Sequence, residues 1–151
     1  GAGNAETGSG SEGEEDDALI NRVNAALDSP ITVVRESNPL AVKGIIGASR
    51  AVLCSRYHGC ISAMSQGIAC IGTSWSHKYE LLYEEYQAGA LLLESTSSSE
   101  KLREVIDLSL KADSQLTQAI ASRASVLKAQ SAAMWDNFQA VAERYSEFER
   151  R

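Results

Sequence analysis

The sequence predicts an α/β domain of Rossmann-like type, with a parallel sheet of about four strands, helices on both faces and a long C-terminal helix. Two observations predict this fold class. Short apolar runs of strand type recur at residues 31–34, 51–54, 68–72 and 90–93. Segments with apolar residues at helical spacing separate these runs. Strands that alternate with helices in this way form parallel sheets that are covered on both faces.

The helices are expected to begin and end at recognisable signals. Asp16 and Asp17 complement the dipole of a helix start, and Ser29–Pro30 ends that helix. Ser37 or Asn38, followed by a proline, opens the next one. A capping box, Ser-x-x-Glu at residues 97–100, opens a later one. The expected helices cover about residues 16–28, 39–47, 59–66, 79–87, 98–109 and 116–148.

Composition divides the chain into three parts. Residues 1–15 contain Gly, Ser, Glu and Ala with nothing to bury, so we expect a disordered acidic linker. Residues 16–115 form the Rossmann-like domain, and residues 116–151 form the C-terminal helix. Because the chain has no initiator Met and starts in a linker-like segment, we expect it to be a piece of a longer protein.

The C-terminal helix carries a heptad seam of apolar and small residues. Two interpretations of this seam remain open. One is dimerisation as a coiled coil; the other, which we favour, is a helix strapped across a neighbouring domain. The seam consists of Ile120, Ala124, Leu127, Ser131, Met134, Phe138, Val141, Tyr145 and Phe148.

Charge and hydropathy exclude two classes of protein. The net charge of −6 comes from residues 1–17, which hold six acidic residues and no Lys or Arg. The remainder is balanced and lacks the basic surplus of a nucleic-acid-binding domain. The longest apolar runs are far shorter than the roughly 20 residues that cross a bilayer.

Three cysteines, Cys54, Cys60 and Cys70, lie in or beside expected buried elements. Their odd number and the lack of a Cys-x-x-Cys pair indicate reduced core thiols in a reducing compartment. We therefore expect a cytoplasmic protein, or one of the Golgi lumen in a eukaryote. A zinc site of Cys54, His58 and Cys60 lacks ligand spacing, so no metal is expected.

The residues that follow two successive strands carry the best indication of function. Arg56 and His58 follow the strand at 51–54, and Ser76 and Lys78 follow the strand at 68–72. Parallel strands joined by a helix bring their carboxyl ends to one edge of the sheet, where ligands of α/β sheets bind. In an extended loop, Arg56 and His58 would point to the same side. Backbone amides from Gly59 onward, at a helix start, would add partial positive charge. Such a crevice suits an anion.

Each of these residues also has an ordinary structural interpretation. Arg56 can form a surface ion pair, and a lone histidine such as His58 is often packed against backbone. Lysines in loops, as Lys78 is, are usually solvated. Ser76 can cap the next helix. A stripe of Tyr79, Tyr83 and Tyr86 is more often core than binding surface.

Three short sequence motifs resemble motifs in the carboxyl-terminal half of the polysaccharide pyruvyl transferase family. They are Ser-Arg-Tyr-His-Gly at 55–59, Ala-Met-Ser-Gln-Gly-Ile-Ala at 63–69, and Trp-Ser-His-Lys-Tyr at 75–79. The resemblance extends more loosely over residues 16–140. The family often has Pro where this chain has Ala69, and Tyr where it has Trp75. Members are about twice as long, so an amino-terminal half is missing.

The resemblance implies one half of a GT-B-like fold, in which two Rossmann-like halves face each other over a cleft. It implies transfer of a pyruvyl group from phosphoenolpyruvate to two sugar hydroxyls, as in exopolysaccharide and cell-wall polysaccharide synthesis. By carry-over, Arg56 and His58 belong to the phosphoenolpyruvate site, with Lys78 as a companion. We expect His58 to be the catalytic residue. Gly59 at the helix start and Ser76, through its hydroxyl, are expected to bind phosphoenolpyruvate together with Arg56 and Lys78. No cofactor is implied. The partners are a glycan or lipid-linked sugar acceptor and the missing half, which supplies the acceptor wall. This chain alone is expected to be inactive.

Two alternatives remain open at this point. One is the donor-binding half of a GT-B-type glycosyltransferase, with Glu94 holding the ribose hydroxyls of a nucleotide-sugar. The other is a non-catalytic half-domain that forms a homodimer through residues 116–151.

Overall fold

The computed structural model describes residues 9–73, 76–94, 96–111 and 114–149. The chain separates into two compact units, residues 1–36 and 37–151. No helix within these described ranges is both long enough and apolar enough to span a membrane.

The first unit contains helix α1 (Ser9–Ala25) and an irregular segment that follows it. The helix begins seven residues earlier than the expected start at Asp16. The Asn24 side chain bonds both backbone groups of Ile31, with 2.7 Å from the Ile31 amide to Oδ1 and 3.1 Å from Nδ2 to the Ile31 carbonyl. An Arg35–Asp17 ion pair adds a second tie between segment and helix.

The strand expected at residues 31–34 is wrong. These residues are irregular and exposed, although their β-branched side chains favour a strand. A strand needs a neighbour for its backbone groups, and Asn24 takes up those of Ile31 instead.

The second unit is built on a three-stranded parallel sheet, in the order β1-β2-β3. Strand β1 (Ala51–Cys54) pairs with β2 (Ala69–Thr73), with Cys54 opposite Gly72. Strand β3 (Leu92–Leu93) pairs with the end of β2 after a 3₁₀ turn, η1 (Gly89–Leu91). The α/β class with a parallel sheet and surrounding helices is confirmed, with one strand fewer than expected.

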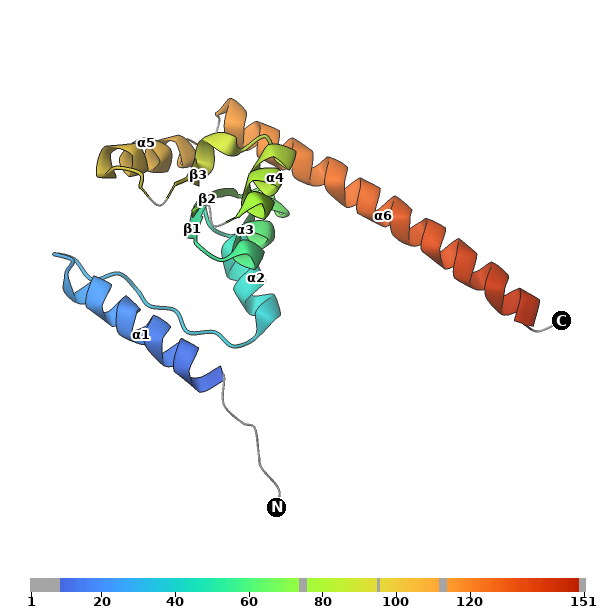
Figure 1. The fold of residues 1–151 in the computed structure, drawn as a ribbon, viewed down its shortest axis with the longest axis horizontal. Helices are drawn as coiled ribbons and strands as arrows, with labels where there is room; N and C mark the ends of the chain where they lie inside the picture. The colour runs from blue at the N-terminus through green and yellow to red at the C-terminus, as the bar shows by residue number, and fades with distance from the viewer. Residues whose placement is uncertain (1–8, 74–75, 95, 112–113, 150–151) are drawn as a thin grey trace, which may run out of the picture. The chain divides into compact units, whose positions relative to one another are not determined.

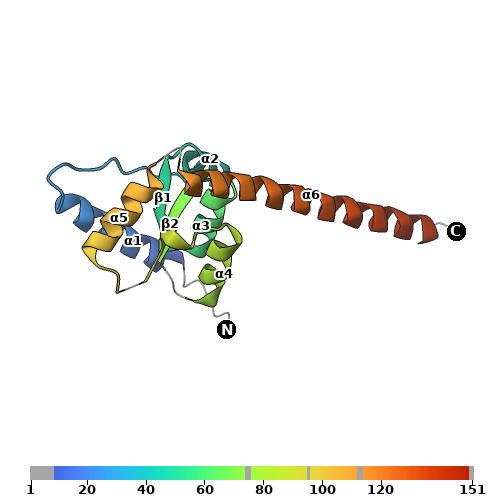
Figure 2. The ribbon, with the colours of Figure 1, turned by 90° about the horizontal axis from the view of Figure 1, so that it is seen from above.

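Helices surround this sheet: α3 and α4 lie on one side of the strands and α5 on the other (Figures 1 and 2). Asn38 caps α2 through bonds from the Leu40 and Ala41 amides, as its position before Pro39 predicts. Ser98 caps α5 by accepting from the Lys101 amide, one residue later than the expected capping box. The bounds are α2 (Pro39–Gly47), α3 (Tyr57–Met64), α4 (His77–Glu85), α5 (Ser99–Ser109) and α6 (Gln115–Glu149).

The core lies around β2, four of whose five residues are buried. Tyr83 of α4 is fully buried and donates a hydrogen bond of 3.0 Å to the Cys70 carbonyl. A Cβ on Gly72 would lie only 2.2 Å from the Tyr83 hydroxyl, so this contact requires glycine. The tyrosine stripe is core, as its spacing indicates: Tyr79, Tyr83 and Tyr86 are all buried.

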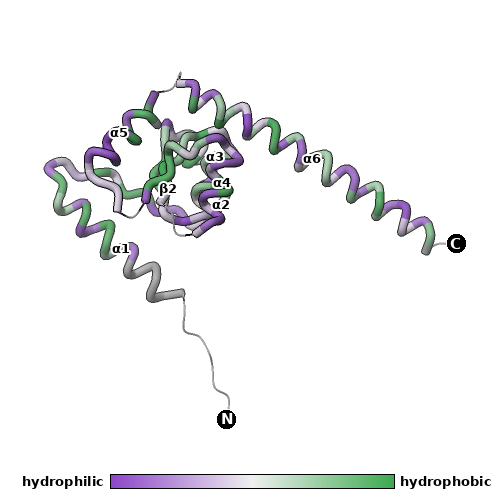
Figure 3. Tube along the Cα trace, turned by 45° about the horizontal axis from the view of Figure 1, so that its top comes forward, coloured by the Kyte–Doolittle hydropathy of each residue, from purple (hydrophilic) through white to green (hydrophobic). Residues whose placement is uncertain are grey.

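Helix α6 has two different halves. In the first, Ile120 and Ala124 are buried, and Gly67, with φ of +78°, admits the Ala121 backbone at close range. From residue 128 onward, every described side chain is exposed. Apolar residues nevertheless recur along this half, which extends beyond the sheet and its helices (Figure 3).

Candidate functional site

The turn after β1 places Arg56 and His58 differently from the expected extended loop. Arg56 is the N-cap residue of α3, and His58 lies inside its first turn. The Cys60 amide already bonds the Arg56 carbonyl at 3.2 Å, so it does not point outward. Tyr57, His58 and Gly59 are the helix positions whose amides have no partner within the helix. The two side chains nevertheless line one pocket.

Gly59 is not among the residues that line this pocket. A Cβ at this position would lie 2.3 Å from the Cys54 sulfur. The glycine therefore gives α3 room to pack closely on the end of β1. Its assignment to phosphoenolpyruvate stays a prediction that concerns the backbone amide alone.

Helix α4 starts beside this turn. Ser76 is its N-cap residue, but its side chain makes no capping hydrogen bond. The capping interpretation of Ser76 therefore does not hold, and the hydroxyl lies in the pocket wall. His77 turns to Glu80, with 2.9 Å between Nδ1 and Oε2, and does not line the pocket. Lys78 does.

Two tyrosines hold the turns together, and neither is among the site residues that the sequence predicts. The Tyr79 hydroxyl donates to the Ser55 carbonyl at 2.8 Å. The Tyr57 and Tyr79 rings pack edge to face, with centroids 5.3 Å apart. The Lys78 ammonium lies 4.9 Å from the Tyr57 ring centroid, within cation–π range. The sequence contained one signal for this role: aromatic residues at 57 and 79 alternate with Arg, His and Lys.

These side chains surround an open pocket of about 370 Å³, here called the charged pocket. Arg56, His58 and Lys78 are all exposed there. No acidic residue stands in this lining, as far as the structure describes the chain. The three basic residues thus converge as the sequence predicts, and the imidazole is not buried in the core. The charged pocket is lined by Ser55, Arg56, Tyr57, His58, Ser76, Lys78 and Tyr79.

The three cysteines are free thiols, and Cys60 and Cys70 are buried. Hydrogen bonding with the Cys60 thiol, together with burial, raises the pKa of Cys54. A raised pKa leaves little thiolate, so Cys54 is a poor nucleophile. Over the described ranges, no three His, Cys, Asp or Glu side chains are grouped in a way that would hold a metal ion.

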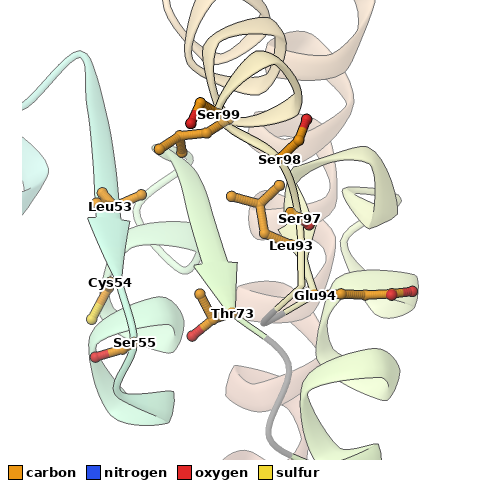
Figure 4. A pocket seen from close by; sticks show the side chains of 10 residues that line it. Leu53, Cys54, Ser55, Thr73, Leu93, Glu94, Ser97, Ser98 and Ser99 are labelled. Carbon is orange, nitrogen blue, oxygen red and sulfur yellow. The ribbon is translucent and has the colours of Figure 1, made fainter.

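A second pocket, of about 440 Å³, opens at the carboxyl ends of all three strands (Figure 4). We call it the hydroxyl pocket because five of its ten lining residues are Ser or Thr. Glu94 belongs to it, but its side chain extends away from β1 and β2. The hydroxyl pocket is lined by Leu53, Cys54, Ser55, Thr73, Leu93, Glu94, Ser97, Ser98, Ser99 and Leu102.

Comparison with known families agrees with the resemblance seen in the sequence. Residues 7–77 match the model of the polysaccharide pyruvyl transferase family. This match supports the resemblance over slightly less than half of the chain. It includes α1, β1, α3 and β2, and it carries Arg56, His58, Gly59 and Ser76, whereas Lys78 lies one residue beyond it. Neither a curated protein nor a solved structure gives a significant match to the chain.

Proposed function

We propose that this chain is the donor-binding part of a polysaccharide pyruvyl transferase and that the charged pocket holds phosphoenolpyruvate. The observation that carries the proposal is the convergence of Arg56, His58 and Lys78 on one pocket at the ends of β1 and β2. Phosphoenolpyruvate has a carboxylate and a phosphate. Three basic side chains that line one pocket suit such a ligand.

Each residue has a distinct part in this proposal. The Arg56 guanidinium binds the carboxylate or the phosphate through paired hydrogen bonds. The Lys78 ammonium, held over the Tyr57 ring, supplies a compact charge to the phosphate. The Ser76 hydroxyl, which makes no capping bond in α4, donates to a phosphate oxygen. The Gly59 amide, at the start of α3, adds a backbone donor.

The reaction needs proton transfer as well as charge. Two C–O bonds form between the sugar oxygens and C2 of phosphoenolpyruvate, while the bond from C2 to the phosphate oxygen breaks. One hydroxyl proton goes to the methylene carbon, which becomes methyl, and the other leaves with phosphate. Histidine is the side chain that most often acts as a general acid or base, so His58 is the proposed general acid that serves the methylene carbon or the leaving phosphate.

Calorimetric titration of the chain with phosphoenolpyruvate tests the donor site. Arg56→Ala removes charge-assisted hydrogen bonds, so it should weaken binding by about 10- to 100-fold. Lys128→Ala, which removes one exposed charge from α6, is the matched control and should leave binding unchanged. Equal affinity for the Arg56→Ala variant and the original chain, or preferential binding of uridine or guanosine diphosphate, would refute the proposal.

The role of His58 in turnover is tested in an assembly that also contains the amino-terminal half that the resemblance implies. His58→Ala should abolish most ketal formation while phosphoenolpyruvate still binds. Undiminished ketal formation by this variant would remove His58 from the mechanism.

A further inference from the structure

The hydroxyl pocket has the chemistry of a site for an uncharged ligand. Its polar lining residues are Ser and Thr together with one acidic residue, Glu94, whose side chain extends away from β1 and β2. No basic residue stands in this lining, within the part of the chain that the structure describes. An anion therefore finds no counter-charge here, in contrast to the charged pocket.

Its apolar lining comes from three leucines on three different elements. Leu53 of β1 is 66% exposed, which is unusual for a strand residue of an α/β sheet. Leu93 of β3 and Leu102 of α5 complete this wall. A ligand that has both hydroxyl groups and an apolar carbon face matches this lining of Ser, Thr and Leu residues. A pyranose ring has both, and the volume of about 440 Å³ falls within the range of small-molecule sites.

Some of the hydroxyls are already engaged inside the protein. The Ser98 oxygen accepts from the Lys101 amide. The Glu100 backbone amide and, second, the Ser98 hydroxyl bond the Glu100 carboxylate and lower the pKa of Glu100. Thr73 and Ser97 come from the end of β2 and the turn before α5. These two residues are therefore the better test positions.

The two pockets meet at Ser55, which lines both. In the proposed reaction, two sugar hydroxyls must reach C2 of phosphoenolpyruvate. A sugar in the hydroxyl pocket would lie next to a donor in the charged pocket. This adjacency links the hydroxyl pocket to the same reaction.

We infer that the hydroxyl pocket binds the uncharged pyranose of the acceptor and presents its hydroxyls across Ser55 to the donor. The inference rests on the proposed function and extends it, since the resemblance assigns the acceptor wall to the amino-terminal half that it implies. The hydroxyl pocket contributes a second acceptor surface, on the donor half itself. The Thr73 and Ser97 hydroxyls bond the sugar, and the three leucines contact its apolar face.

Amide chemical shifts of the ¹⁵N-labelled chain, measured by NMR, test the inference. The probes are methyl glucoside, methyl galactoside and methyl mannoside, titrated well beyond millimolar concentration because single sugars bind weakly. At least one should cause saturable shifts at Thr73, Leu93 and Ser97. Thr73→Val, which keeps the side-chain shape, and Ser97→Ala should each weaken this binding by about 5- to 10-fold. Ser125→Ala on α6 is the matched control and should have no effect.

Phosphoenolpyruvate is titrated into the same samples, so that the two proposals fail separately. Its binding should depend on Arg56 and persist in Thr73→Val. If phosphoenolpyruvate binds but no methyl glycoside shifts these amides, the sugar site is refuted and the donor site stands. Shifts at these amides caused by uridine diphosphate, with none from the glycosides, would overturn the inference in favour of a nucleotide.

Discussion

Helix α4 has two sides that contribute to the protein in different ways. On its buried side, Tyr83 and Tyr86 pack in the core, whereas at its exposed start Lys78 faces the charged pocket. The core contacts determine where the turns lie, and the exposed residues supply the charge. Tyr79 belongs to both, since it is buried and also holds the Ser55 carbonyl. Stability and ligand binding should therefore respond to different substitutions, except at Tyr79.

The largest expected effect is that of Gly72→Ala. The new methyl group would meet the hydroxyl of fully buried Tyr83, which has no room to move. We expect a loss of about 3 kcal/mol in the free energy of unfolding, measured by urea denaturation. Gly89→Ala is the matched control, because a Cβ there meets nothing within 4 Å. Equal stability of both variants would contradict the close packing of α4 on β2.

Alkaline pH should also act on the buried side. Burial raises the pKa of Tyr83 and of Tyr86 above that of an unfolded tyrosine. Their contribution to stability is complete below the unfolded pKa of about 10 and is lost as pH rises above it. For Tyr83 the free energy of unfolding should fall by about 1.4 kcal/mol per pH unit in this range. Urea denaturation at several pH values from about 8 to about 11 checks this slope. The Tyr83→Phe variant should lose less stability per pH unit.

Tyr79→Phe should affect both properties by a moderate amount. The substitution removes the hydrogen bond to the Ser55 carbonyl and keeps the ring contact with Tyr57. We expect a loss of about 1 kcal/mol in stability and a several-fold weaker affinity for phosphoenolpyruvate. Denaturation and calorimetric titration measure the two effects. A change in stability without any change in affinity would show that the turn keeps its position without this bond.

The smallest effect on stability is expected for the exposed basic residues. Arg56→Ala and Lys78→Ala should each change the free energy of unfolding by less than about 0.5 kcal/mol, because surface substitutions away from the core rarely do more. Both should nevertheless weaken phosphoenolpyruvate binding. A large loss of stability in either variant would mean that the charge is part of the scaffold, and the separation of the two sides of α4 would fail.

The elements that hydrophobic pattern and local capping determine could be predicted from the sequence. The strand at 51–54, the strand expected at 68–72 and found at 69–73, and the cap at Asn38 are examples, because their signals lie within a few residues. Residues 31–34 were mispredicted because strand formation depends on a partner distant in sequence. The start of α1 was missed because Gly and Ser have low helix propensity.

At the candidate site, the sequence predicted which residues meet but not how they are held. Parallel strands bring the turns that carry Arg56 and Lys78 to one edge whatever the side chains are. The ring of Tyr57 under the Lys78 ammonium depends on side-chain directions that spacing alone does not determine. The same limit applies to the hydroxyl pocket, whose lining comes from positions as distant as 53 and 102.

The exposed half of α6 carries a tryptophan whose intrinsic fluorescence depends on its exposure to solvent. Trp135 is 59% exposed and packs edge to face on Phe138. Its fluorescence should be that of an indole in water, and emission would move to shorter wavelength whenever another surface excludes solvent from this face. With Trp75 replaced by Phe, the emission spectrum would report the covering of α6 without any attached dye.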